Sequence, residues 1–276
     1  MTALAARPLM AAAERRARLW RPRNLMLIGA ALVVLGINGT ANAQAPTGPS
    51  TPVPAEAPDA FGAKVRAYLL QHPEVIMEAV EIFQQRQQQA AAEVAKGVIA
   101  SRADEIFRDP MAPVGGNSEG DVTLVEFFDY NCPYCRQVAP TLVELRRADP
   151  RLRLVYKEFP ILGPGSEAAA KAALAAVRQG KYEALHDTLM QIEGKVAEAA
   201  VFQAAMTAGL NVEQLKRDMA DPALDEAIAR NRALAAELGI NGTPGFVIAD
   251  RVIPGLAEKE ALEGLIAEAR SKGTSP

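Results

Sequence analysis

Cys132 and Cys135 are the only cysteines in the 276-residue chain, and they lie in the stretch VEFFDYNCPYCRQVAPTL. Two cysteines separated by two residues can form a metal clip, a haem attachment site, a structural disulfide or a redox-active pair. A structural zinc site needs four ligands, and the only two histidines, His72 and His186, stand at no ligand spacing. A c-type haem needs histidine directly after the second cysteine, where this chain has Arg136.

A purely structural disulfide between these cysteines would close too short a loop to remove much entropy from the unfolded chain. The redox pair remains, so we expect no metal and no other cofactor. The cysteines follow an apolar run, Val122–Phe128, that is typical of a buried strand, and an amphipathic helical pattern begins with them. Cys132 should therefore lie at a helix N-terminus, where free backbone N–H groups and the helix dipole stabilise an anion.

The two cysteines should have different roles. A thiolate at a helix N-terminus has a lowered pKa and is the attacking species, so Cys132 is the expected nucleophile. Pro133 suits the first helical position and stiffens the loop. Cys135 lies one turn further into the helix, where it should be shielded and should resolve mixed disulfides.

The surrounding pattern predicts an α/β fold. A strand at 122–128, a helix and a second strand at 151–159 indicate a parallel βαβ unit. An alanine-rich helical region, about 166–238, follows and is broken by glycines and by Asp221-Pro222. Two short strands, GFVIA and RVIPG, and a helix from about 257 to 269 close the chain. We expect a small mixed sheet interrupted by a helical insertion.

The segment 60–110 is predicted to be helical almost throughout, with Pro73 in the first turn of a second helix. Apolar residues recur in it at a seven-residue step, which places them on one face. They are Leu69, Ile76 and Phe83, and in parallel Tyr68, Val75 and Ile82. This face either packs on its own domain or forms a homo-oligomer. We favour the oligomer, because a short helix pair cannot bury such a stripe alone.

The N-terminus has the pattern of an export signal. Five arginines between residues 15 and 23 precede the apolar run Leu25–Ile37, and Ala41-Asn42-Ala43 then offers a cleavage site. The alternative is an uncleaved anchor, but a run of 13 residues is short of the ~20 needed to span a bilayer. We predict four parts: a signal peptide (1–43), a disordered linker (44–59), the helical oligomerisation segment (60–110) and the catalytic domain (111–276).

The predicted cleavage also changes the net charge. The first 43 residues hold six arginines and one acid, so 24 basic and 32 acidic residues remain and the net charge moves from −3 to −8. No basic run survives that could bind nucleic acid. The expected partners are therefore proteins or small molecules. Export also places the pair in a compartment where disulfide chemistry occurs.

Two motifs together carry a family resemblance: FFDYNCPYC and GTPGFVI, residues 242–248. They resemble the thioredoxin fold of the DsbA-like thiol–disulfide oxidoreductases, over roughly residues 122–271. The helical insertion matches that family as well. With its N-terminal helices the chain is most similar to the ScsC-like branch, which consists of exported disulfide isomerases or oxidases with an N-terminal oligomerisation segment.

The resemblance implies roles for further residues. Pro244 should follow a cis peptide bond beside the cysteines, and the backbone of Thr243 should pair with the substrate peptide. Glu126 should be a buried acid that exchanges a proton with the inner thiol; the alternative is a strand-edge charge facing water. Tyr134 stands where strongly oxidising relatives often carry histidine, which argues against a very oxidising potential.

The expected function is that of an exported, periplasmic thiol–disulfide oxidoreductase acting on cysteine-containing client proteins. A membrane redox partner would reset Cys132 and Cys135. The oligomerisation segment favours a disulfide isomerase, because several active sites would then surround one client. A monomeric dithiol oxidase is the first alternative. A copper-handling or chaperone-like binding protein is the second, since thiolates suit Cu(I).

Overall fold

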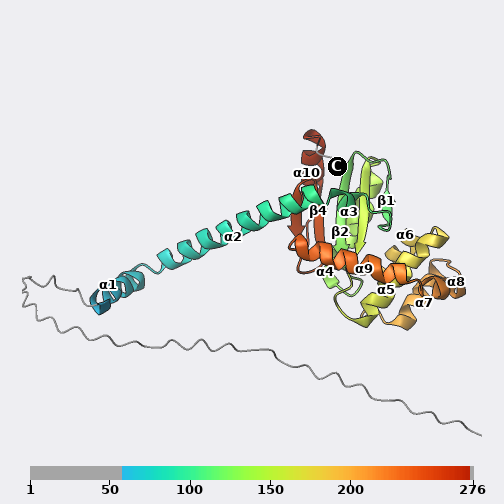
Figure 1. Ribbon diagram of the computed structural model, residues 1–276, viewed down its shortest axis with the longest axis horizontal. Helices are drawn as coiled ribbons and strands as arrows, with labels where there is room; N and C mark the ends of the chain where they lie inside the picture. The colour runs from blue at the N-terminus through green and yellow to red at the C-terminus, as the bar shows by residue number, and fades with distance from the viewer. Residues whose placement is uncertain (1–57, 274–276) are drawn as a thin grey trace, which may run out of the picture. The chain divides into compact units, whose positions relative to one another are not determined.

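The computed structural model describes residues 58–273 (Figure 1). The predicted signal peptide, and the predicted linker up to residue 57, lie outside the described residues. No helix in the described part is both long and apolar enough to cross a membrane.

A mixed five-stranded sheet is the centre of the fold, with the strand order β1-β3-β2-β4-β5. The strands are β1 (Val114–Gly116), β2 (Val122–Phe128), β3 (Leu152–Glu158), β4 (Gly245–Ile248) and β5 (Arg251–Pro254). Helix α4 (Pro133–Ala148) connects β2 to β3, which pair in parallel as predicted. Strand β4 pairs antiparallel with both β2 and β5. The predicted fold class, a thioredoxin-like fold with a helical insertion, is confirmed.

The sheet is buried on both faces. Leu124 and Phe128 of β2 point into a large cluster that includes the inner faces of α4 and of α10 (Lys259–Ser271). Val125 and Phe127, the alternate residues of the same strand, point into a second cluster on the other face. All seven residues of β2 are buried. The near-continuous apolar run of this strand reflects burial on both sides.

The helical insertion consists of five α-helices and a short 3₁₀ helix, and Figure 1 shows α5 to α8 grouped beside the sheet. They are α5 (Pro164–Ala176), η1 (Val177–Gln179), α6 (Tyr182–Met190), α7 (Glu198–Thr207), α8 (Val212–Asp218) and α9 (Pro222–Glu237). Gly180, Gly194 and Gly209 separate the helices in left-handed backbone conformations, which glycine adopts without a steric cost.

Three helices precede the sheet: α1 (Pro58–Gln71), α2 (Glu74–Ser101) and α3 (Ala103–Phe107). Pro73 lies at the N-cap of α2, so the seven-residue step from Leu69 to Ile76 crosses a break between two helices. The 28 residues of α2 correspond to about 42 Å. Its last turns pack on the sheet, because Ile99 is buried in the second cluster together with Ile106 and Phe107. The helical segment and the catalytic domain therefore share a core near residue 100.

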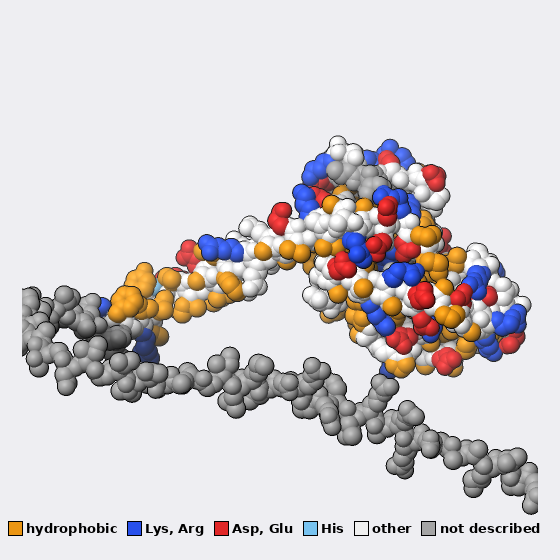
Figure 2. Space-filling view, in the orientation of Figure 1, with side chains coloured by type: hydrophobic (Ala, Val, Ile, Leu, Met, Phe, Trp, Pro, Cys, Tyr) orange, Lys and Arg blue, Asp and Glu red, His pale blue; other side chains and the backbone are white. Residues whose placement is uncertain are grey.

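Most of the apolar stripe on α1 and α2 is exposed. Of residues 60–94, only Leu69 and Val75 are half-buried, and all the others are exposed. Figure 2 shows hydrophobic side chains gathered along these two helices. Phe83 is 61% exposed and Ile76 is 49% exposed. The alternative that this face packs on its own domain is therefore wrong for the described residues.

One strand was not predicted. It is β1, which lies between α3 and β2 and pairs antiparallel with the edge of β3. Its three residues include two glycines, so it carries no β-propensity signal. Gly115 lies so close to Tyr156 and Glu183 that a β-carbon there would clash.

Candidate active site

The sheet topology brings two distant loops together. Phe127 of β2 lies opposite Gly245 of β4 in an antiparallel ladder. The residues that follow Phe127 in the chain therefore run alongside the residues that precede Gly245. This arrangement places the Cys132 loop beside Thr243 and Pro244, although more than one hundred residues separate them in the sequence.

Cys132 is the N-cap residue of α4, with an extended backbone (φ −77°, ψ 120°) and Pro133 at the first helical position. Both cysteines are free thiols. The Cys132 Sγ lies 3.1 Å from the carbonyl oxygen of Thr243, which accepts a hydrogen bond from the sulfur when the thiol is protonated. The Cys132 side chain is only 4% exposed.

The environment of Cys132 stabilises its thiolate. The pKa of Cys132 is lowered to about 5, mainly because the Cys135 thiol donates a hydrogen bond to it. The Thr243 side chain and the backbone N–H groups of Cys135 and Tyr134 lower this pKa further, while burial opposes them. These N–H groups belong to the first turn of α4, where they have no helical acceptor. At neutral pH this sulfur is an anion ready for nucleophilic attack.

Cys135 has the opposite character. It is fully buried, and its pKa is raised well above the ordinary thiol value, first by burial and then by its hydrogen bond to Cys132 and the charge of Glu126. The pair therefore consists of one thiolate and one thiol. This division allows one sulfur to attack and the other to resolve.

Glu126 lies in the middle of β2, paired with Tyr156 on one side and Phe246 on the other. Glu126 is 1% exposed, so its predicted burial is confirmed and the alternative of a strand-edge charge facing water is wrong. Neither carboxyl oxygen has a hydrogen-bond partner among the described residues. Burial, and next the charge of Cys132, raise the pKa of Glu126 to about 8. A carboxyl with this pKa can exchange a proton near neutrality.

The Thr243–Pro244 peptide bond is cis, as the family resemblance implies. Pro244 is buried and Thr243 is half-buried. The Pro244 carbonyl accepts a hydrogen bond from the Gly255 N–H. By contrast, Pro133 and Tyr134 are exposed, and Tyr134 is 56% exposed. The apolar ring of Tyr134 therefore lies on the surface beside a nearly buried nucleophile.

Sequence reasoning missed three polar residues around the cysteines. Asp129 and Asn131 precede Cys132, and Arg136 follows Cys135. All three make hydrogen bonds to loops distant in sequence. The only sequence signal was an acid directly after an apolar strand, in the stretch FFDYN.

Two further buried ionisable residues, Lys157 and Glu158, lie on opposite faces of β3. Lys157 donates to Asp109 (2.8 Å) and to the Glu105 carbonyl, on the face away from Glu126. Glu158 shares the face of Glu126 and accepts hydrogen bonds from the hydroxyls of Tyr130 and Tyr182. Burial raises the pKa of Glu158 well above the usual carboxyl range. Its direct contacts are thus with aromatic residues of the core.

Two family models match the chain. The model of the DSBA-like thioredoxin domain covers residues 123–267, which is more than half of the chain. The chain belongs to the DSBA-like thioredoxin domain family. A second model, the copper resistance protein ScsC N-terminal domain, matches residues 59–90. The DSBA-like match contains both cysteines, Glu126 and the cis Thr243–Pro244 bond, and the ScsC match covers α1 and the first half of α2.

Solved structures agree with this membership. A thioredoxin-like oxidoreductase from Silicibacter pomeroyi is 54% identical, with a TM-score of 0.60, over 61% of this chain and 97% of that one. A linker-deletion mutant of Proteus mirabilis ScsC is 28% identical (TM-score 0.62) over 80% of this chain and 99% of that one. Salmonella enterica Typhimurium BcfH is 31% identical (TM-score 0.66) over 77% and 96%. The match to ScsC and BcfH extends beyond the catalytic domain.

Curated relatives include longer proteins. The chain is 31% identical over 176 residues to a Na⁺/H⁺ antiporter NhaA of Salinispora tropica, covering 60% of this chain and 27% of that protein. It therefore spans about a quarter of the length of the antiporters it matches. A probable disulfide bond formation protein D of Bacillus cereus is 25% identical over 160 residues, covering 53% of this chain and 74% of that protein.

Proposed function

We propose that this chain is an exported thiol–disulfide oxidoreductase that acts on protein substrates, principally as a disulfide isomerase. The observation that carries the proposal is the position of Cys132. Its sulfur lies at the N-terminus of α4, 3.1 Å from the carbonyl before the cis-proline, with a pKa lowered to about 5. A buried thiol that could resolve a mixed disulfide stands one helical turn away.

The chemistry needs only the two sulfurs and a proton acceptor. The Cys132 thiolate attacks one sulfur of a client disulfide, forms a mixed disulfide and releases the other client sulfur as a thiolate. In isomerisation, another client thiolate then attacks the mixed disulfide and regenerates the Cys132 thiolate, with no net oxidation. In reduction, Cys135 gives up its proton, attacks Cys132 and releases the client. Ionised Glu126 is the proposed acceptor of that proton.

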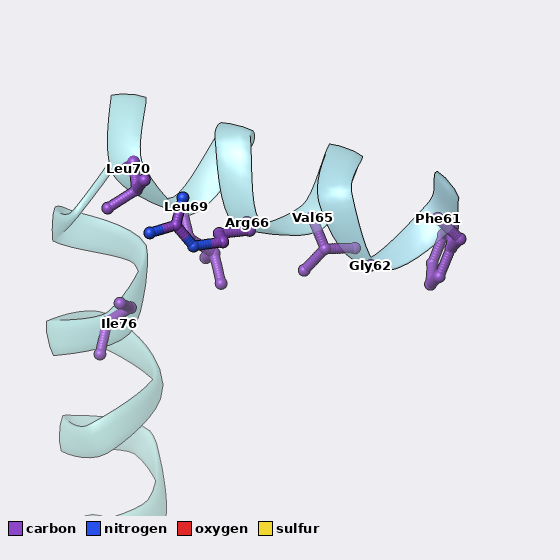
Figure 3. Close-up of a pocket in the computed structure, with 7 residues that line it drawn as sticks. All are labelled: Phe61, Gly62, Val65, Arg66, Leu69, Leu70 and Ile76. Carbon is purple, nitrogen blue, oxygen red and sulfur yellow. The ribbon is translucent and has the colours of Figure 1, made fainter. Parts of the chain in front are cut away.

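An exposed apolar groove on α1 and the start of α2 favours isomerisation over simple oxidation. It has a volume of about 460 Å³ and is lined by residues of α1 and by Ile76 at the start of α2 (Figure 3). No described residue covers this apolar surface, and we propose that a second or third copy of the chain does. An oligomer would present several Cys132 sites to one misfolded client at high effective concentration.

A monomeric dithiol oxidase is the second candidate, and the pKa of Cys132 favours it. A stabilised thiolate stabilises the reduced protein, so the corresponding disulfide becomes a stronger oxidant. The exposed Tyr134 offers no imidazole to add to that effect. A membrane redox partner would complete either cycle, by returning electrons to an isomerase or by accepting them from an oxidase.

A copper-handling or chaperone-like binding protein is the third candidate, supported by the similarity of residues 59–90 to the N-terminal domain of the copper resistance protein ScsC. Cys132 and Cys135 are the only cysteines of the chain and could offer two thiolates to Cu(I). The described residues hold no cluster of three or more histidine, cysteine or acidic side chains that could bind a metal. The export itself is proposed from the N-terminal pattern, and a similar Salmonella enterica protein is described as a periplasmic thioredoxin-like protein.

The decisive experiment uses residues 44–276 with scrambled and with fully reduced ribonuclease. We expect catalytic recovery of ribonuclease activity from the scrambled form, in a buffer that keeps Cys132 reduced. An oxidase would instead restore activity only to reduced ribonuclease, while it is itself reduced. A binding protein would turn over neither substrate, and stoichiometric binding of Cu(I) without turnover would contradict the proposal.

A further inference from the structure

A buried carboxylate three residues before the nucleophile joins the loops that surround it. Asp129 is 1% exposed and accepts four hydrogen bonds. One oxygen, Oδ1, accepts from the Asn131 N–H (2.7 Å) and from the Ser166 hydroxyl (2.7 Å). The other, Oδ2, accepts from the N–H groups of Ile161 (2.7 Å) and Leu162 (2.9 Å). All four donors are neutral groups. They come from three separate chain segments: the turn before Cys132, the loop after β3 and the start of α5.

We propose that Asp129 is a positioning residue for Cys132, holding the Cys132 loop against the loop after β3 and against α5 so that the sulfur stays at the N-terminus of α4. This inference rests on the proposed thiol–disulfide chemistry of Cys132. It adds a residue that touches neither cysteine through its side chain and that the mechanism above does not use.

Asp129 fixes the turn that leads into α4. The Asp129 carbonyl accepts from the Cys132 N–H at 3.0 Å, while its carboxylate accepts from the Asn131 N–H. Backbone and side chain of one residue thus fix two consecutive N–H groups. They set the extended backbone of Cys132 that an N-cap requires.

Asp129 also binds the loop after β3. The side chains of Ile161 and Leu162 are 41% and 45% exposed, so this loop lies at the surface. Its two successive N–H groups both point at Asp129 Oδ2. Together with the bond from the Phe159 N–H to the Phe128 carbonyl (2.9 Å), this oxygen holds the loop after β3 against the Cys132 turn.

Asn131 and Arg136 link the same turn to the helical insertion. The Asn131 side chain donates to Ser166 (3.0 Å) and accepts from the Val196 N–H (2.7 Å). Arg136 donates to the carbonyls of Tyr130 (2.8 Å) and Gly194 (2.6 Å). The segment 194–196 therefore approaches the cysteines from the insertion side, and Ser166 connects it back to Asp129.

The position that Asp129 gives to the Cys132 loop should also determine how well the Cys132 thiolate is stabilised. The hydrogen bonds that lower the pKa of Cys132 come from the first turn of α4, from Thr243 and from Cys135. They act only while Cys132 is held at the N-cap. Without the Asp129 carboxylate, the turn loses the acceptor of four hydrogen bonds and should relax away from that position.

The test compares Asp129→Asn with Asp221→Asn in the full mature chain. Asp221 is a matched control, since its carboxylate caps α9 by accepting from the Ala223 N–H, far from the cysteines in sequence. The readout is the rate of Cys132 alkylation as a function of pH, measured by mass spectrometry. We expect the alkylation midpoint to rise from about 5 to about 6 in Asp129→Asn, which would lower the alkylation rate at pH 5 about fivefold.

Ser166→Ala removes one donor to the same carboxylate and serves if Asp129→Asn does not fold. It should shift the midpoint in the same direction by a smaller amount, and the control should keep the wild-type midpoint even if its thermal stability falls. Folded variants at Asp129 and Ser166 with the wild-type alkylation profile would overturn the inference. A wild-type protein whose Cys132 is unreactive at pH 6 would instead contradict the proposed function itself.

Discussion

Replacing Cys132 with serine should abolish thiol–disulfide exchange while the fold remains intact. The hydroxyl is close in size to the thiol, so the buried site loses little packing, but it does not ionise near neutral pH and cannot form a disulfide. Insulin reduction and ribonuclease reactivation should fall to the uncatalysed rate. Circular dichroism and the melting temperature serve as the controls for folding.

Cys135→Ser should have a different effect, because the nucleophile survives while the resolving sulfur is lost. Mixed disulfides between Cys132 and client proteins should then accumulate and persist until an external thiol is added. Non-reducing electrophoresis of a periplasmic extract would detect them. The assignment of roles would be wrong if alkylation of the reduced wild-type protein labelled Cys135 faster than Cys132.

The second large effect concerns the apolar face of α1 and α2. The mature wild-type protein should be a dimer or trimer, and Ile76→Asp combined with Phe83→Asp should yield a monomer. In an oligomer formed through this apolar face, the introduced aspartates of each copy would have to be buried without an opposite charge. The catalytic domain should stay folded, because the clusters on both faces of its sheet contain neither residue.

The double aspartate variant should lose one activity and keep another. Ribonuclease reactivation should fall, since a captured client no longer meets a second Cys132 site at high effective concentration. Insulin reduction should persist, because each site still works alone. Gln85→Asp with Gln89→Asp is the matched control: it adds the same charge to α2 on the opposite face. A wild-type monomer at tens of micromolar in analytical ultracentrifugation would remove the isomerase preference and favour the oxidase.

The sequence was sufficient for the features that depend on local pattern. A run of apolar residues identified β2, and the junction of that strand with a helix placed Cys132 at an N-terminus. The motifs CPYC and GTPGFVI carried the family resemblance. That resemblance predicted a cis-proline loop near the cysteines. Glycines and Asp221-Pro222 marked the breaks in the insertion correctly, because these residues have strong and local backbone preferences.

Features that depend on long-range partners could not be predicted. The donors to Asp129 lie up to 37 residues away, and the partner of Asn131 at Val196 lies 65 residues away. Nothing local distinguishes such an aspartate from one facing water. The short strand β1 exists only because β3 offers an open edge. The end of α2 is buried by contacts with the sheet that its helical periodicity did not reveal.

The pH dependence of the reduced protein follows from Cys132. Its pKa is lowered to about 5 in the folded state, against an ordinary value of about 8.5. Ionisation therefore stabilises the reduced fold, fully so above the ordinary value, and this stability is lost as the pH falls through about 5. The oxidised protein has no thiolate and should show no such loss.

The most direct test of the central claim is a thiolate absorbance titration of the reduced protein, with Cys132→Ser as the blank. The account predicts a single thiol that ionises with a midpoint near pH 5, while Cys135 stays protonated throughout the neutral range. A midpoint near the ordinary value of about 8.5 would contradict the assignment of Cys132 as the activated nucleophile.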